Sequence, residues 1–258
     1  MIDTLTLAIV AATPLLLAVQ GELVVQRSGI INLGIEGMML VAALTATIAA
    51  TSFGATAGFL AGIAGALIVA LLFGTFAIVF RADQIVTGTA INLLAVGATG
   101  VVYRALGSSR FVTGSLQRDL IVPLAWIVAP AIVALILWRT MFGLRLRACG
   151  ENPEAVTATG HSVAVHRWAA LGIEAVLVGL AGAHLALALS IVIFGRWKVK
   201  GAILGTALFG IAAALQYAMQ ASAHGYPFHV LLAVPYVVTL LILCGIAGKV
   251  RAPESLGR

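Results

Sequence analysis

The chain alternates between long apolar runs and short polar stretches. None of the long apolar runs holds more than one Asp, Glu, Lys or Arg; they are residues 5–19, 29–50, 58–80, 85–103, 121–141, 168–194, 201–220 and 230–246. A helix needs about 20 apolar residues to cross a bilayer, where its backbone groups must pair internally. We therefore expect each run to be a spanning helix. This includes the first run, since residues 1–20 lack the basic start of a secretory signal.

Composition supports this interpretation. Hydrophobic residues make up 62% of the 258 residues and charged residues 9%, with a mean hydropathy of +1.12, whereas soluble domains have about 25% charged residues. No polar stretch is long enough to fold as a soluble domain. We expect one all-α transmembrane domain over residues 1–258, a polytopic bundle of about 8 to 9 spanning segments.

Small residues recur at helical spacing in the third run. Gly54, Gly58, Gly62 and Gly65 lie near one helical face, a pattern typical of helices whose backbones approach closely. We expect these glycines to serve packing rather than binding.

The net charge of +6 comes from basic residues in the short loops, which indicates topology determinants and not a nucleic-acid surface. Arg139, Arg145, Arg147 and Arg167 place the stretch 142–167 on the cytoplasmic side, and the basic C-terminal tail belongs there too. The positive-inside rule also predicts a cytoplasmic location for the basic loop 195–200. However, the run 168–194 is long enough for only one crossing. One crossing would put that loop outside. Either the loop breaks the charge rule, or the run 168–194 enters and returns as a short broken hairpin, or a segment is absent from this chain.

The stretch 142–167 is a polar island that carries the signals of one short helix. Asn152 suits the N-cap, Pro153 the first helical position, Glu154 the positive helix end, and Gly160 a left-handed C-terminus. A helix of about seven residues is marginal alone in water. We expect it to dock into a partner; the alternative is an ordinary capped turn.

Several polar residues interrupt the apolar runs. Glu36, Glu174 and His184 are ionisable groups, which are costly in a bilayer, and Asn32, Gly34 and Gly37 near Glu36 suggest a bent or partly unwound helix. Neutral polar groups follow in and beside the later runs. One hypothesis is that such polar residues line a path through the membrane; these residues are Asn32, Glu36, Gln84, Thr87, Asn92 and Gln216. The alternative for all six is hydrogen bonding between helices.

The sequence lacks the motifs of nucleotide-binding and metal-dependent enzymes. The pair Gly248-Lys249 is followed by Val250, so no nucleotide-binding P-loop occurs, and no His-Glu-x-x-His metal motif is present. The spacing of Cys149 and Cys244 suggests neither metal nor redox work. We expect no enzyme activity, no catalytic residue, no metal site and no cofactor.

Three segments together resemble permease subunits of ABC importers. They are Gln26-Arg-Ser-Gly-Ile-Ile-Asn-Leu-Gly-Ile-Glu-Gly-Met-Met39, Ala82-Asp-Gln-Ile-Val-Thr-Gly-Thr-Ala-Ile-Asn92 and Phe142-Gly-Leu-Arg-Leu-Arg-Ala-Cys-Gly-Glu-Asn-Pro-Glu-Ala155. The similarity runs across most of the chain. The branch it resembles is that of nucleoside and simple-sugar permeases, related to ribose-type and branched-chain amino-acid permeases.

The resemblance implies a multi-pass subunit of a bacterial cytoplasmic (inner) membrane that moves nucleosides or simple sugars inward by alternating access. It implies a coupling helix that contacts separate ATPase subunits; its residues here are Glu151, Asn152, Pro153, Glu154, Ala155, Thr159 and Gly160. It also implies a second related permease in a heterodimer and an extracytoplasmic binding lipoprotein or periplasmic protein.

The chain departs from the family pattern at Ser190-Ile191, where members carry about 15 to 20 further residues, close to the length of one crossing. A crossing restored there would return the loop 195–200 to the cytoplasm. Two alternatives stay open: an ion-driven secondary transporter that uses Glu36 or Glu174, and a structural subunit without transport.

Overall fold

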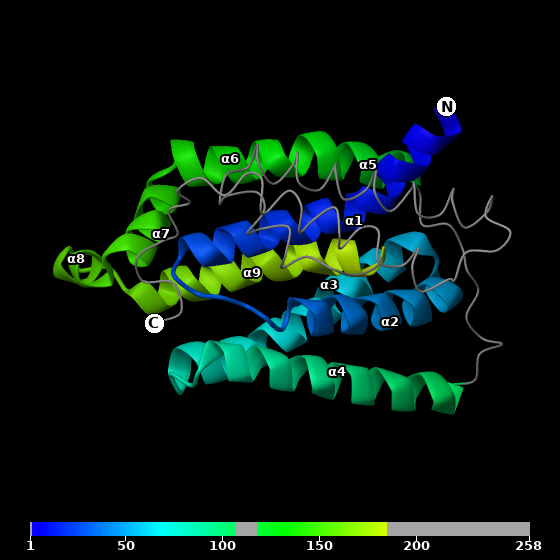
Figure 1. Ribbon diagram of the computed structural model, residues 1–258, viewed down its shortest axis with the longest axis horizontal. Coiled ribbons are helices and arrows are strands. Elements are labelled where there is room, and N and C mark those ends of the chain that lie inside the picture. The colour runs from blue at the N-terminus through cyan, green and yellow to red at the C-terminus, as the bar shows by residue number, and fades with distance from the viewer. Residues whose placement is uncertain (1, 107–117, 185–258) are drawn as a thin grey trace, which may run out of the picture.

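The computed structural model describes residues 2–106 and 118–184 (Figure 1), and this part of the chain is all-α, without a strand. Its helices are α1 (Ile2–Arg27), α2 (Ile35–Phe53), α3 (Ala55–Gly74), the π-helical η1 (Thr75–Val79), α4 (Gln84–Leu106), α5 (Arg118–Pro123), the π-helical η3 (Leu124–Val128), α6 (Ala129–Arg139), α7 (Met141–Glu151), α8 (Pro153–Ala158) and α9 (Val163–Gly182).

Five stretches of the described chain are long and apolar enough to cross a membrane. They are Ile35–Phe53, Thr56–Val79, Gln84–Leu106, Ile121–Arg139 and Val163–Gly182, which agree with five predicted runs, and the run 5–19 lies inside α1. The predicted runs 201–220 and 230–246, the site Ser190-Ile191, Cys244 and the loop 195–200 lie outside the described residues.

Two helices begin several residues away from the start of the apolar run that predicted them. The run 29–50 becomes helical only at Ile35, because the chain turns at Gly29, whose φ of 88° lies in the left-handed region. The run predicted to start at residue 168 begins at Val163, because the Ser162 side chain accepts a hydrogen bond from the Val165 N–H and caps α9 there.

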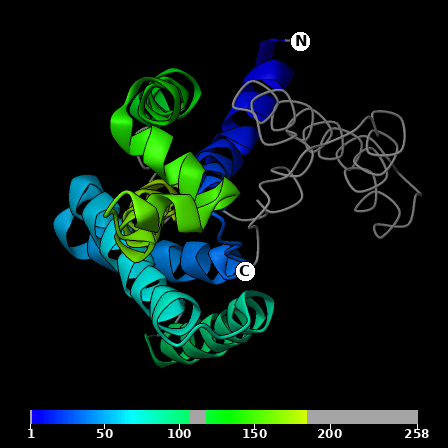
Figure 2. The same ribbon diagram turned by 90° about the vertical axis from the view of Figure 1, so that its left-hand side faces the viewer.

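The helix α9 occupies the centre of the bundle. It packs against α1, α2 and α3, while α4 lies outside and packs mainly on α2. Figures 1 and 2 show α6 on the opposite side of α1 from α2 and α3. The buried residues of α9 include His166, Ala170, Glu174 and Val178. A polar side chain on this helix therefore reaches the interior of the described bundle.

Glycines permit this central packing. A Cβ at Gly179 would lie 2.5 Å from the Ile63 Cα, and one at Gly62 would lie 3.0 Å from the Gly179 carbonyl oxygen. Close approach at Gly58, Gly62 and Gly65 confirms the predicted packing face. Gly54 differs, since its φ of 84° makes the turn between α2 and α3.

Arginines gather at one end of the described bundle. The C-terminal ends of α1 and α6, the short helices α7 and α8, and the start of α9 all lie at the left of Figure 1. This end holds Arg27, Arg139, Arg145, Arg147 and Arg167, and the positive-inside rule assigns it to the cytoplasm.

Candidate functional site

The cytoplasmic island contains two helices rather than the single one expected from its sequence. The Thr140 hydroxyl accepts a 3.0 Å hydrogen bond from the Gly143 N–H and caps α7. Asn152 then caps α8 with a 3.0 Å bond from the Ala155 N–H, and Pro153 takes the first turn as predicted.

The C-terminus of α8 is a Schellman motif. Gly160 has a φ of 79°, its N–H donates to the Thr157 carbonyl at 2.9 Å, and the His161 N–H donates to the Val156 carbonyl at 3.3 Å. These are the paired bonds that close a helix through a left-handed residue. The predicted conformation of Gly160 is confirmed.

Most of α8 is open to solvent. Val156 is its one buried residue, at 4% exposure, whereas Glu154, Ala155 and Thr157 are exposed. Of the other residues named from the resemblance, Glu151, Asn152, Thr159 and Gly160 are exposed and Pro153 is half-buried. The helix thus presents a continuous free surface held to the bundle by one apolar anchor.

The helix α7, which precedes α8, packs tightly against the end of α1. A Cβ at Gly150 would collide with the Arg27 carbonyl oxygen, so only glycine permits this approach. The Arg147 and Arg27 guanidinium groups lie 4.3 and 5.7 Å from the Trp138 ring centroid, within the range of cation–π attraction. These contacts tie α7 to both α1 and α6.

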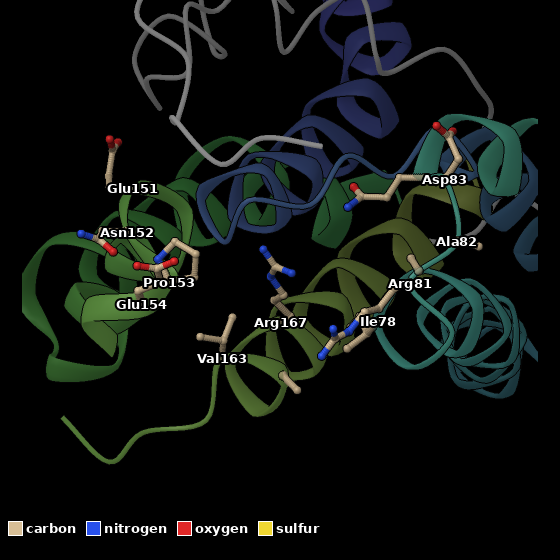
Figure 3. Close-up of a pocket in the computed structure, with 13 residues that line it drawn as sticks. Ile78, Arg81, Ala82, Asp83, Glu151, Asn152, Pro153, Glu154, Val163 and Arg167 are labelled. Carbon is tan, nitrogen blue, oxygen red and sulfur yellow. The ribbon is translucent and has the colours of Figure 1, made fainter. Parts of the chain in front are cut away.

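A cavity of about 710 Å³ lies beside α8. Figure 3 shows Asn152, Pro153 and Glu154 on one side of it, Arg81 and Asp83 on the other, and Arg167 between them. The cavity therefore joins the turn before α4 to the junction of α7 and α8.

A non-helical segment, residues 28–34, connects α1 to α2 and is held by side chains distant in sequence. The Gln84 Oε1 accepts from the Ile31 N–H at 2.7 Å. The Asn92 amide donates to the Leu33 carbonyl at 2.8 Å and accepts from the Gly37 N–H at 2.8 Å. The predicted unwinding near Asn32 is confirmed, and these amides pair its exposed backbone groups.

Asn32 lies at the centre of this arrangement. It is fully buried, its Nδ2 donates to the Glu174 Oε2 at 2.9 Å, and its Oδ1 accepts from the Gly34 N–H at 3.0 Å. Its own backbone N–H donates to the Glu22 Oε1 at 3.4 Å. Glu22 did not emerge from sequence reasoning, because it falls just beyond the first apolar run.

The remaining path residues do not gather around Asn32. Glu36 is exposed in the first turn of α2. Thr87 is buried, and its hydroxyl donates at 2.7 Å to the carbonyl of Asp83, the residue before α4. Gln216 lies outside the described residues.

The island contains one cysteine, Cys149, which is buried in α7. Burial raises the pKa of the Cys149 thiol above its ordinary value, and the nearby charge of Arg167 opposes that rise. No group of three or more His, Cys, Asp or Glu residues that could hold a metal ion occurs in the described part of the chain.

A solved structure shares this helical arrangement. It is an inward-facing ABC transporter assigned to the metal-chelate type, with a TM-score of 0.56, 15% sequence identity and coverage of 94% of this chain and 85% of that one. The match shows that the bundle has the fold of an ABC transporter membrane subunit.

Sequence comparison gives the family. Residues 4–195 match the family described as "Branched-chain amino acid transport system / permease component", and the chain belongs to it. The guanosine ABC transporter permease NupQ of Bacillus subtilis is 30% identical, over 96% of this chain and 93% of its own length. The nucleoside ABC transporter permease NupC of Lactococcus lactis is 32% identical with the same coverage.

This membership fixes the broad function. The chain is an ABC transporter permease subunit, an integral protein of the cytoplasmic membrane, and as such a transport component that works with ATPase and substrate-binding subunits. The NupQ alignment extends over 297 positions, more than the 258 residues here. NupQ therefore carries residues that this chain lacks.

Proposed function

We propose that this permease imports nucleosides by alternating access. ATP binding closes the partner ATPase subunits, their movement displaces α8, and the attached helices α7 and α9 redirect a central path across the membrane. A second, related permease completes the membrane heterodimer, and an extracytoplasmic binding protein delivers the substrate.

The observation that supports this proposal most is the construction of α8. Asn152 and the Schellman turn at Gly160 fix both of its ends, while its exposed residues leave a free surface for a partner. Gly150 and Val156 hold the helices to the bundle. A short rigid helix anchored in this way transmits a push rather than absorbing it.

Substitution at Gly160 tests the role of α8. A β-branched Val at a φ of 79° is strained by about 1–2 kcal/mol, so Gly160→Val should distort the helix end. We expect ATP hydrolysis to continue in the assembled transporter while uptake falls, and deletion of residues 153–159 should have the same effect. The control is Gly172→Val, at a glycine in α9 with open space around it and no left-handed φ.

Normal uptake in Gly160→Val and in the deletion variant would refute the role of α8. The substrate class is tested separately, by competition against labelled guanosine uptake. Unlabelled nucleosides should compete and glucose or ribose should not. Competition by sugars alone would move the proposal to the simple-sugar branch.

A further inference from the structure

Two carboxyl groups meet in the interior of the described bundle. Glu22 projects from α1 and Glu174 from α9, both are 0% exposed, and both accept a hydrogen bond from Asn32. The two helices approach closely beside them, because a Cβ at Gly21 would lie 3.1 Å from the Glu174 Cα. Buried carboxyl groups in a membrane protein are costly and call for a functional explanation.

Two of the four carboxyl oxygens of this pair lack a hydrogen-bond donor among the described residues. The Glu22 Oε1 accepts from the Gln26 Nε2 at 2.8 Å and from the Asn32 N–H at 3.4 Å, and the Glu174 Oε2 accepts from the Asn32 Nδ2 at 2.9 Å. The Glu22 Oε2 and the Glu174 Oε1 are buried and receive no donor from any other described residue. Each of them lacks, in this part of the structure, the donor that a buried acceptor requires.

An ionised carboxylate is an acceptor only, so two carboxyl groups bond to each other only when one of them carries a proton. We propose that Glu22 and Glu174 form a binding site for one shared proton, and that this proton holds segment 28–34 against α9. Within the described part of the chain no Lys, Arg or His side chain is paired with either carboxyl group; Gln26 from α1 and Asn32 from the segment donate to the pair, and the Met38 sulfur accepts from the same Asn32 amide.

The site lies where it can influence the cytoplasmic island. Asn32 links the pair to segment 28–34, whose Ser28 carbonyl accepts from the Arg167 Nε at 3.3 Å. The preceding residue, Arg27, supplies the carbonyl against which Gly150 packs. Loss of the proton places two like charges together in the interior. Their repulsion weakens the packing of α7 against the end of α1.

Infrared spectroscopy of the purified full-length permease at neutral pH tests for the proton directly. We expect the C=O stretching band of a protonated carboxylic acid in the wild type. The Glu22→Gln/Glu174→Gln double variant should lose this band. The matched control is Glu36→Gln, an exposed glutamate on α2, which should keep it.

A second readout follows the unfolding temperature as the pH is raised. The wild type should lose stability as the pH rises toward the point where the proton leaves, because over this range the folded state holds a proton that the unfolded state has lost. Either single variant, Glu22→Gln or Glu174→Gln, should fold and show a weaker dependence, since the amide N–H₂ replaces the proton as donor. The control Glu36→Gln should retain the full dependence.

The proposal is overturned if the wild type lacks the band, if the double variant keeps it, or if the Gln variants follow the wild-type pH dependence. It is also overturned if replacing sodium with choline at constant pH lowers the unfolding temperature of the wild type only, since the occupant would then be a cation. Neither readout involves transport, so these failures would leave the proposed import function standing.

Discussion

Cys149 shows how the environment of a single residue governs its chemistry. It is fully buried in α7, within the cytoplasmic island. Removing a thiolate from water disfavours the charged form, so burial raises the pKa of the Cys149 thiol, and Arg167 only partly offsets this. Its side chain therefore acts as part of the packing.

Thiol labelling checks this environment. In a Cys244→Ser background, we expect maleimide to modify Cys149 slowly in the native protein and rapidly in denaturant. Because the folded pKa is raised, the contribution of Cys149 to stability is present below the ordinary thiol pKa and is lost as the pH rises above it. Equal labelling rates in native and denatured protein would show that the thiol is accessible.

The contacts among Asn32, Glu22 and Glu174 are a feature that the sequence alone does not reveal. Asn32 and Glu174 were recognisable as unusual polar residues in apolar runs, yet their partnership with Glu22 depends on how α1 and α9 pack. Gln84 and Asn92 were predicted either to line a path or to hydrogen-bond between helices, and in the structure they bond the backbone of segment 28–34. Such partners are distant in sequence and leave no local signal.

Elements differ in how far their own sequence determines them. The short helix α8 was predictable because its cap residues act locally, through Asn152 and Gly160. The helix α7 was not predicted, because Arg145 and Arg147 alternate there with leucines and suggest no helical face. Tertiary contacts stabilise it: Leu146, Cys149 and Gly150 are buried, and α7 packs against α6 and α9.

Substitution of Gly150 tests the packing of α7 against α1. The change Gly150→Val forces a side chain into the Arg27 carbonyl, and overpacking of this kind costs about 1–3 kcal/mol. We expect a lower unfolding temperature and weaker uptake. Gly97→Val, at a glycine with open space around it, is the control and should change stability much less; an equal loss in both variants would contradict the proposed close contact.

At the scale of the whole molecule, topology follows from charge and hydropathy together. The apolar runs predicted five of the described spanning helices, and the arginines at the ends of α1, α6 and α7 gather at one end of the bundle. Both properties depend on composition averaged over many residues, which is why the sequence reveals them. The packing order, with α9 in the centre, depends on matched surfaces such as Gly62 and Gly179.

The central claim is that α8 is the surface through which the ATPase acts on this permease. The most direct measurement places a photo-crosslinking residue at Ala155, exposed on α8, and as a control at Thr51, exposed near the far end of α2. In the assembled transporter, Ala155 should capture the ATPase subunit and Thr51 should not. Capture from Thr51, or none from Ala155 in a complex that co-purifies with its ATPase, would contradict the claim.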